Sequence, residues 1–246
     1  MGTRNRKIKV LIAFGTRPEA IKVAPLILAL KKDPRFQVFS VLTGQHRQMV
    51  DQVLEIFRIK PDRDLDLMRD NQDLVSLSHR LLVRLQGILR GFRPDWVVVQ
   101  GDTTTAFVVA WVAFYERIRV AHLEAGLRSH DPQRPFPEEI NRRLISQVAD
   151  LHFAPTASAR KNLLGEGIPA WRIRVTGNTG IDSLLLCLRA RRHGNVKVIA
   201  RSVAVARNEV VARNKVTKQT ITTSDTRRDP SRCSGQATQT ITAPND

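Results

Sequence analysis

Residues 8–22 read Ile-Lys-Val-Leu-Ile-Ala-Phe-Gly-Thr-Arg-Pro-Glu-Ala-Ile-Lys, and this stretch decides the fold class. The pattern predicts an apolar strand over 8–14, then a short polar turn that opens an amphipathic helix with Pro18 in its first turn. Proline is preorganised for the first helical position. The helix start would direct unpaired backbone amides, and the positive end of the helix dipole, beyond the strand. Arg17 adds a planar guanidinium that suits phosphate, so we expect an anion-binding turn; an ordinary turn with a solvated Arg17 is the alternative.

The signatures of two other nucleotide-binding folds are missing. No G-x-G-x-x-G follows the first strand, and no G-x-x-x-x-G-K-[ST] occurs in the chain. These two motifs mark dinucleotide-binding folds and P-loops. If the turn binds an anion, it therefore uses a motif different from these two.

Predicted strands and helices alternate from residue 8 to about residue 186. Further strands are expected at 36–43, 96–100, 119–123, 151–154 and 173–175, with helices at 18–31, 49–57, 74–92, 104–117, 138–148 and 158–166. Residues 58–73 are polar and predict a surface connection. Near-continuous apolar strands between helices indicate an α/β fold with a doubly wound parallel sheet covered on both faces. Ligands of such sheets bind beyond the carboxyl ends of the strands.

The chain is strongly basic, with a formal net charge of +17 over 246 residues. Residues 188–246 hold twelve Lys or Arg and four Asp or Glu, so they carry +8 of that charge. Aromatic residues make up only 5% of the chain, and no known nucleic-acid module is recognisable. We therefore expect no specific nucleic-acid partner. A basic body built around acidic ligands, followed by a basic tail of low complexity that is predicted to be disordered, explains the charge better.

Cysteine and histidine usage gives no metal-ligand spacing. Cys187 and Cys233 lie far apart, which is typical of a reducing compartment. The basic N-terminus is followed by a short apolar run that Lys9 interrupts, so a signal peptide is not expected. The longest uncharged apolar stretch, 106–114, is far shorter than the roughly 18 residues of a membrane span. These features predict a cytoplasmic protein without a metal site or a membrane partner.

Four charged residues follow predicted strands or begin a helix, where they could carry chemistry. Asp102 comes directly after a buried strand; capping the next helix is its alternative role. Glu124 ends a strand close to a glycine, a poor place for packing and a good one for reaching a ligand. Glu138 and Arg142 are four residues apart on one helix, which allows an ion pair, although a solvated surface pair has the same spacing.

Five motifs together resemble one enzyme family. They are Gly15-Thr16-Arg17-Pro18-Glu19-Ala20-Ile21-Lys22, Gly101-Asp102-Thr103-Thr104, His122-Leu123-Glu124-Ala125-Gly126-Leu127-Arg128, Pro137-Glu138-Glu139-Ile140-Asn141-Arg142 and Thr176-Gly177-Asn178-Thr179. In this order they resemble the N-terminal half of the non-hydrolysing UDP-N-acetylglucosamine 2-epimerases, over residues 8–186. The resemblance implies one Rossmann-like half of a GT-B-like fold. It also implies interconversion of UDP-GlcNAc and UDP-ManNAc by elimination and re-addition of UDP.

The resemblance also assigns roles to individual residues. Asp102, Glu124 and Glu138 would be the acid/base carboxylates, and Arg142 would orient Glu138. The expected substrate-binding set is Gly15, Arg17, Lys22, His46 and Arg128. No cofactor is implied, because UDP itself is the leaving group. The expected partners are a UDP-sugar substrate and a second copy of the chain in a homodimer.

The resemblance ends near residue 186, which divides the chain into a Rossmann-like epimerase domain, 1–187, and the basic tail, 188–246. The family's second domain carries a Gly-His-Arg loop and a Ser-Gly-Gly loop. Here His193-Gly194 has the wrong order and Ser234-Gly235-Gln236 has one glycine. A truncated or frameshifted gene would give this pattern. We therefore expect an epimerase impaired by truncation; a non-catalytic remnant that binds UDP-sugar weakly is the alternative.

Overall fold

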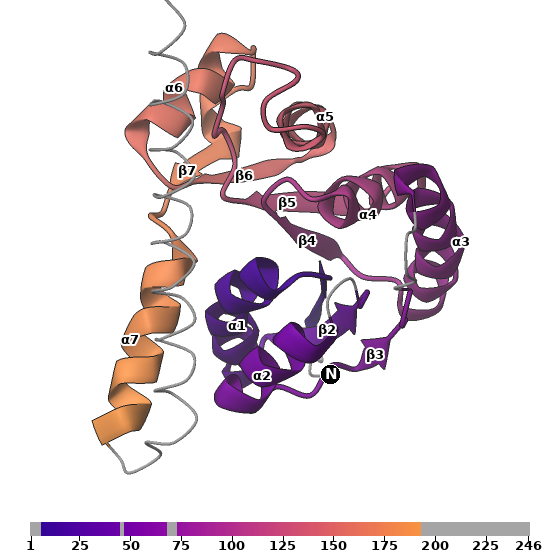
Figure 1. Ribbon diagram of the computed structural model, residues 1–246, viewed down its shortest axis with the longest axis vertical. Helices are drawn as coiled ribbons and strands as arrows, with labels where there is room; N and C mark the ends of the chain where they lie inside the picture. Colours follow the sequence, from indigo (N-terminus) through magenta and orange to yellow (C-terminus); the bar gives the residue numbers. More distant parts are fainter. Residues whose placement is uncertain (1–5, 45–46, 68–72, 193–246) are drawn as a thin grey trace, which may run out of the picture. The chain divides into compact units, whose positions relative to one another are not determined.

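The computed structural model describes residues 6–44, 47–67 and 73–192, and the structural statements below concern these residues. Seven parallel strands form one sheet in the order β3-β2-β1-β4-β5-β6-β7 (Figure 1). The strands are β1 (Ile8–Phe14), β2 (Phe36–Leu42), β3 (Arg63–Asp64), β4 (Trp96–Gln100), β5 (Arg119–Leu123), β6 (Leu151–Ala154) and β7 (Ile173–Val175). The strand order reverses between β1 and β4, so the predicted doubly wound parallel sheet is confirmed.

Helices cover both faces of this sheet. They are α1 (Arg17–Lys32), α2 (Arg47–Phe57), α3 (Leu74–Phe92), α4 (Thr104–Tyr115), α5 (Glu138–Val148), α6 (Ala157–Gly165) and α7 (Thr179–Arg192), with a 3-10 turn η1 (Ala170–Arg172). One apolar core joins the sheet to α1, α2 and α7, and a second joins its other face to α3, α4 and α5 (Figure 1). A smaller core packs α6 against the β6–β7 end. Both faces of the strands are buried, which explains their near-continuous apolar sequences.

Helix α3 buries the leucines that recur at the helical period. Leu77, Leu81, Leu85 and Leu89 are buried at intervals of four residues, and the helix has the predicted bounds. Leu74 is exposed, because it is the first residue after the N-cap Asp73. In the same way Met49 is exposed in α2, and its neighbour Val50 is buried instead.

Two elements were not predicted. The connection 58–73 contains β3, a two-residue edge strand that pairs with Val41 and Leu42 of β2. Helix α7 follows the last strand and runs through the division expected at 187/188. The chain separates into two units, Met1–Ile199 and Ala200–Asp246, and the second lies wholly outside the described residues. The division into 1–187 and 188–246 therefore stays a prediction. No helix of the described part is long and apolar enough to cross a membrane.

Candidate active site

The β1–α1 turn satisfies its own backbone amides. Thr16 is the N-cap of α1, and the Glu19 carboxylate accepts hydrogen bonds from the Gly15 amide at 2.8 Å and the Thr16 amide at 2.7 Å. These two amides therefore have an acceptor within the protein, and anion binding at this turn stays a prediction. The Thr16-Arg17-Pro18-Glu19 spacing is a capping box, and this signal could have revealed the arrangement from the sequence.

Glu19 also joins this turn to the loop between β4 and α4. Its other carboxylate oxygen accepts the Thr103 hydroxyl at 2.6 Å, and the residue is only 2% exposed. Burial raises the pKa of Glu19, while the bonds from Thr103, Gly15 and Thr16 act to lower it. Sequence reasoning gave Glu19 no role. In the structure its hydrogen bonds link the β1–α1 turn to the β4–α4 loop.

Glu124 lies at the end of β5 and is held on both carboxylate oxygens. Lys22 and Gln100 each donate to Oε2 at 2.5 Å, and Asn178 donates to Oε1 at 2.8 Å. The side chain remains 14% exposed, so a ligand in the crevice could still reach it. Lys22, expected to hold the nucleotide, instead forms an ion pair with Glu124.

Asp102 follows β4, and α5 holds it. Arg142 donates to the Asp102 carboxylate, and Asn141 donates to its backbone oxygen at 2.9 Å. Arg142 also contacts Glu139, at 3.3 Å. The ion pair expected between Glu138 and Arg142 is not formed, because Arg142 bonds Asp102 and the buried Glu139 instead.

Glu139 and Glu138 are neighbours with different environments. Glu139 is fully buried; burial acts to raise the pKa of Glu139, but bonds from the Ser129 amide and Arg143 outweigh it and lower that pKa. The Oε2 atom of Glu138 is also buried, and among the described residues it has no hydrogen-bond partner. A buried oxygen without a partner is costly in an interior. Glu138 therefore offers an acceptor to a proton or to a ligand donor.

The other expected binding residues differ in their placement. Arg17 is in the first turn of α1 and is 8% exposed. The Arg128 guanidinium is fully buried: it pairs with Glu166 at 2.6 Å and donates to Ser146 at 3.0 Å, which favours a structural role. His46 lies outside the described residues. Binding of substrate by these residues stays a prediction.

Two buried histidines stand side by side on β5 and β6. His122 and His152 are register partners, and both are 0% exposed. His122 Nε2 contacts the Gly101 carbonyl at 2.7 Å, while neither ring nitrogen of His152 makes a hydrogen bond of normal geometry in the described part. Burial lowers the pKa of His122 to about 3 and that of His152 to about 4. Both rings are therefore neutral at pH 7, and the His122 bond ties the loop that carries Asp102 to β5.

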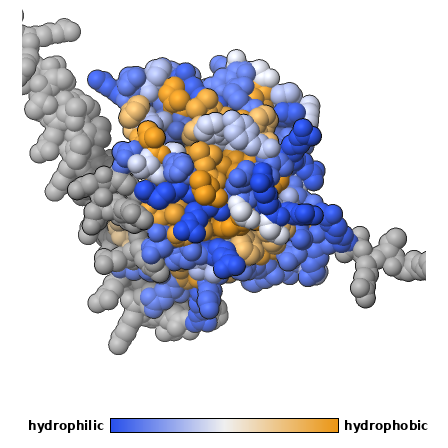
Figure 2. All heavy atoms as spheres, turned by 90° about the vertical axis from the view of Figure 1, so that its right-hand side faces the viewer, coloured by the Kyte–Doolittle hydropathy of each residue, from blue (hydrophilic) through white to orange (hydrophobic). Residues whose placement is uncertain are grey.

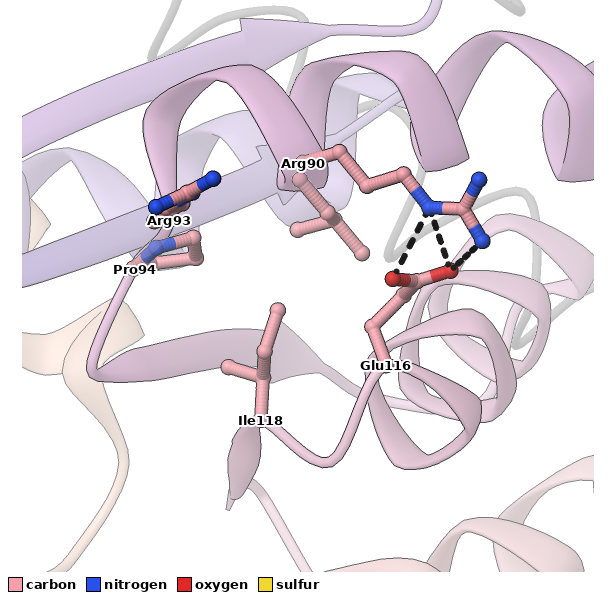
Figure 3. A pocket seen from close by; sticks show the side chains of 6 residues that line it. Arg90, Arg93, Pro94, Glu116 and Ile118 are labelled. Carbon is pink, nitrogen blue, oxygen red and sulfur yellow. Dashed lines mark hydrogen bonds and ion pairs between the residues drawn. The ribbon is translucent and has the colours of Figure 1, made fainter.

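A hollow of about 410 Å³ lies elsewhere, beside the amino ends of β4 and β5 (Figure 3). Its lining residues include Arg90, Arg93 and Glu116, and Arg90 is engaged with Glu116 at 3.0 Å. The catalytic candidates follow the carboxyl ends of the same strands, so this hollow is not part of the crevice. Among the described residues, no group of three or more His, Cys, Asp or Glu is arranged to hold a metal ion.

Comparisons with known proteins point to one family. The profile of the family described as UDP-N-acetylglucosamine 2-epimerase matches residues 28–220. The UDP-N-acetylglucosamine 2-epimerase of Bacillus subtilis is 52% identical over 184 residues, which cover 75% of this chain and 48% of that protein. The chain therefore spans about half the length of the curated relatives it matches.

Solved structures agree with the sequence comparison. The Neisseria meningitidis UDP-GlcNAc 2-epimerase bound to UDP-GlcNAc is 47% identical, with a TM-score of 0.74, covering 79% of this chain and 52% of that one. The Methanocaldococcus jannaschii enzyme in complex with UDP-GlcNAc and UDP is 38% identical, with a TM-score of 0.71, covering 76% and 51%.

Proposed function

The chain belongs to the UDP-N-acetylglucosamine 2-epimerase family, and from that premise we propose that its crevice serves the interconversion of UDP-GlcNAc and UDP-ManNAc. The observation that carries the proposal is that Asp102 and Glu124 follow strand ends at the carboxyl edge of the sheet and pair there with Arg142 and Lys22. Parallel α/β sheets bind ligands at this edge.

The chemistry asks for groups that move a proton at C2 of the sugar and for cations near the departing diphosphate. Elimination breaks the C1–O bond to UDP and removes the C2 proton, giving 2-acetamidoglucal. Re-addition of UDP then follows return of the proton to the opposite face of C2. Glu124, Asp102 and Glu138 are the proposed proton carriers, and Arg17 is the proposed diphosphate contact. No redox group takes part in this proposed route, because the C2 proton is removed in an elimination whose leaving group is UDP.

The half-length match bears on turnover. We expect residues 1–246 alone to show little or no turnover, because they match only about half the length of the relatives. Each lost charge-assisted hydrogen bond to substrate would cost about 1.5–3 kcal/mol of binding. Weak binding of UDP-sugar without turnover is the second candidate function, and the half-length coverage is the observation that favours it.

The decisive experiment follows exchange of the C2 proton in D₂O by NMR, with UDP-GlcNAc as substrate. The chain is assayed alone and together with a polypeptide that corresponds to the remaining half of the B. subtilis relative. We expect exchange in the mixture, its loss in Glu124→Gln, and its retention in His79→Gln, whose side chain is exposed on α3. Exchange that survives Glu124→Gln would contradict the proposed role of Glu124.

We also propose a homodimer formed through α4. Along this helix the Phe107 and Trp111 rings are stacked at 5.6 Å, and the Trp111 and Tyr115 rings are tilted at 5.3 Å. Phe114 and Tyr115 are more than half exposed. Figure 2 shows apolar side chains gathered on the face that presents α3 and α4. An exposed apolar area of this kind is typical of a protein interface.

Sedimentation analysis tests the dimer. Phe114→Arg should halve the mass, because it would bury a charge in the interface. Trp171→Arg, which alters an equally exposed aromatic residue on η1, should leave the mass unchanged. A monomeric wild-type chain would refute the dimer. A cytoplasmic location, where nucleotide sugars are at hand and cysteines stay reduced, completes the proposal.

A further inference from the structure

The motif Thr176-Gly177-Asn178-Thr179 contributes a side chain to the site. Asn178 lies between β7 and α7, and its Nδ2 donates to Glu124 Oε1 at 2.8 Å. Its Oδ1 accepts the Gly180 amide at 2.9 Å. Because the amide oxygen is used at the start of α7, the orientation of the side chain is set, and its nitrogen must face Glu124.

Glu124 is therefore held from three elements. Lys22 of α1 and Gln100 of β4 bond one carboxylate oxygen, and Asn178 bonds the other. The backbone of Glu124 is left-handed, with φ of 61°, a conformation that residues with a Cβ adopt at an energetic cost. Among the described residues, Asn178 alone donates to Oε1, so it determines how that oxygen is turned.

A hydrogen bond joins helix α7, which follows Asn178, to α1 at the residue before Lys22. Pro25 lies inside α1 and has no amide hydrogen, so the Ile21 carbonyl lacks its usual intrahelical donor. The hydroxyl of Ser183, 2% exposed on α7, donates to that carbonyl. The bond gives a partly buried carbonyl its donor and fixes α7 against the helix that carries Lys22.

We propose that Asn178 is a positioning residue that sets the orientation of the Glu124 carboxylate, and that the Ser183–Ile21 bond keeps α7 where Asn178 can do so. The acid/base task of Glu124 rests on the proposed function; the hydrogen bond and its coupling do not.

Asn178→Asp isolates the contact. Aspartate keeps the oxygen that accepts the Gly180 amide, and it caps a helix as well as asparagine does, so α7 keeps its start. The change removes only the donor to Glu124 and faces that carboxylate with a like charge. In the double variant with Glu124→Gln, the new amide can donate to the new carboxylate, which restores the pair with its polarity reversed.

Urea unfolding of the four chains, each of 246 residues, forms a double-mutant cycle. We expect each single change to reduce the folding equilibrium constant by tenfold or more, and the double variant to be at least tenfold more stable than the two single changes predict. Residues without direct contact add to within about twofold. Additivity within that limit would overturn the proposal. Gln37→Glu, which adds a charge at an exposed position of β2, combined with Glu124→Gln, is the additive control.

A spectroscopic signal separates positioning from general stability. In chains with ¹³C-labelled glutamate carboxyls, the Glu124 resonance is identified by its loss in Glu124→Gln. Asn178→Asp should move this resonance, and Gln37→Glu should not. In the complemented enzyme, Asn178→Asp should slow C2 exchange at least tenfold with KM unchanged. An unmoved resonance refutes the positioning role; a moved resonance with no exchange in any wild-type mixture refutes the proposed function instead.

Discussion

Acid should destabilise the protein through His152, and replacing this side chain should remove a calculable share of the effect. Burial lowers the pKa of His152 from 6.5 to about 4. Between pH 6.5 and pH 4 the His152 imidazole is protonated in the unfolded chain but stays neutral in the folded chain. Stability that is present above pH 6.5 is therefore lost as the pH falls toward 4. From pH 7 to pH 5 this linkage lowers the free energy of unfolding by about 2 kcal/mol.

His122, with a pKa lowered to about 3, should contribute a similar loss of about 2 kcal/mol over the same interval. The wild-type chain should therefore lose about 4 kcal/mol through the pair, and His152→Leu about half of that. Leucine also removes two ring nitrogens that have no hydrogen bond of normal geometry. It therefore leaves no buried polar group unpaired.

The measurement is urea unfolding at pH 7 and pH 5 for the wild type, His152→Leu and His79→Leu. His79 is exposed on α3, so the same substitution there should keep the full dependence on pH. If His152→Leu loses as much stability between the two pH values as the wild type does, burial of a neutral ring is not the cause.

Three further predictions use matched variants. Gly126→Ala should lower the free energy of unfolding, measured by urea titration, by about 3 kcal/mol or more. The reason is that φ is 86° and that a Cβ would lie 2.3 Å from the Ala159 carbonyl oxygen. Gly87→Ala, with open space around it in α3, should raise the free energy of unfolding by about 1 kcal/mol in the same measurement. Arg142→Met should cost about 3 kcal/mol, because it removes the cation shared by Asp102 and the fully buried Glu139 and leaves Glu139 with Arg143. Arg90→Met, at an exposed pair, should leave the thermal unfolding temperature nearly unchanged. Any DNA binding seen in filter assays should vanish when residues 193–246 are removed and should fall on the order of a thousandfold from low to moderate salt; salt-resistant binding by the shortened chain would revive a nucleic-acid function.

The main elements could be predicted because their sequence patterns are long and consistent. β1, β4 and α3 have the predicted bounds, because long apolar runs and a four-residue leucine spacing specify buried strands and a buried helix face by themselves. β3 is two charged residues at a sheet edge and has no period to detect. α7 has little amphipathic character, and its place depends on a carbonyl in α1 that only the folded chain brings near it.

The location of the site could be predicted, but its pairings could not. Asp102 and Glu124 follow strand ends, and parallel topology brings such ends together. Helical spacing allowed Arg142 to meet either Glu138 or Glu139, and burial of Glu139 together with the distant Asp102 decided the outcome. Lys22 was expected to hold the nucleotide; in the structure it pairs with Glu124, and its contact with a nucleotide stays a prediction.

The capping carboxylate of Glu19 bears on inhibitor design. A group tethered within its own helical turn competes at an effective concentration above the mM range of short flexible linkers. Free phosphate or sulfate would have to displace it from the Gly15 and Thr16 amides. An anionic inhibitor directed at this turn would therefore bind weakly, because it would have to displace the Glu19 carboxylate. Compounds that donate hydrogen bonds to Glu138, whose buried oxygen has no partner among the described residues, face no such competitor.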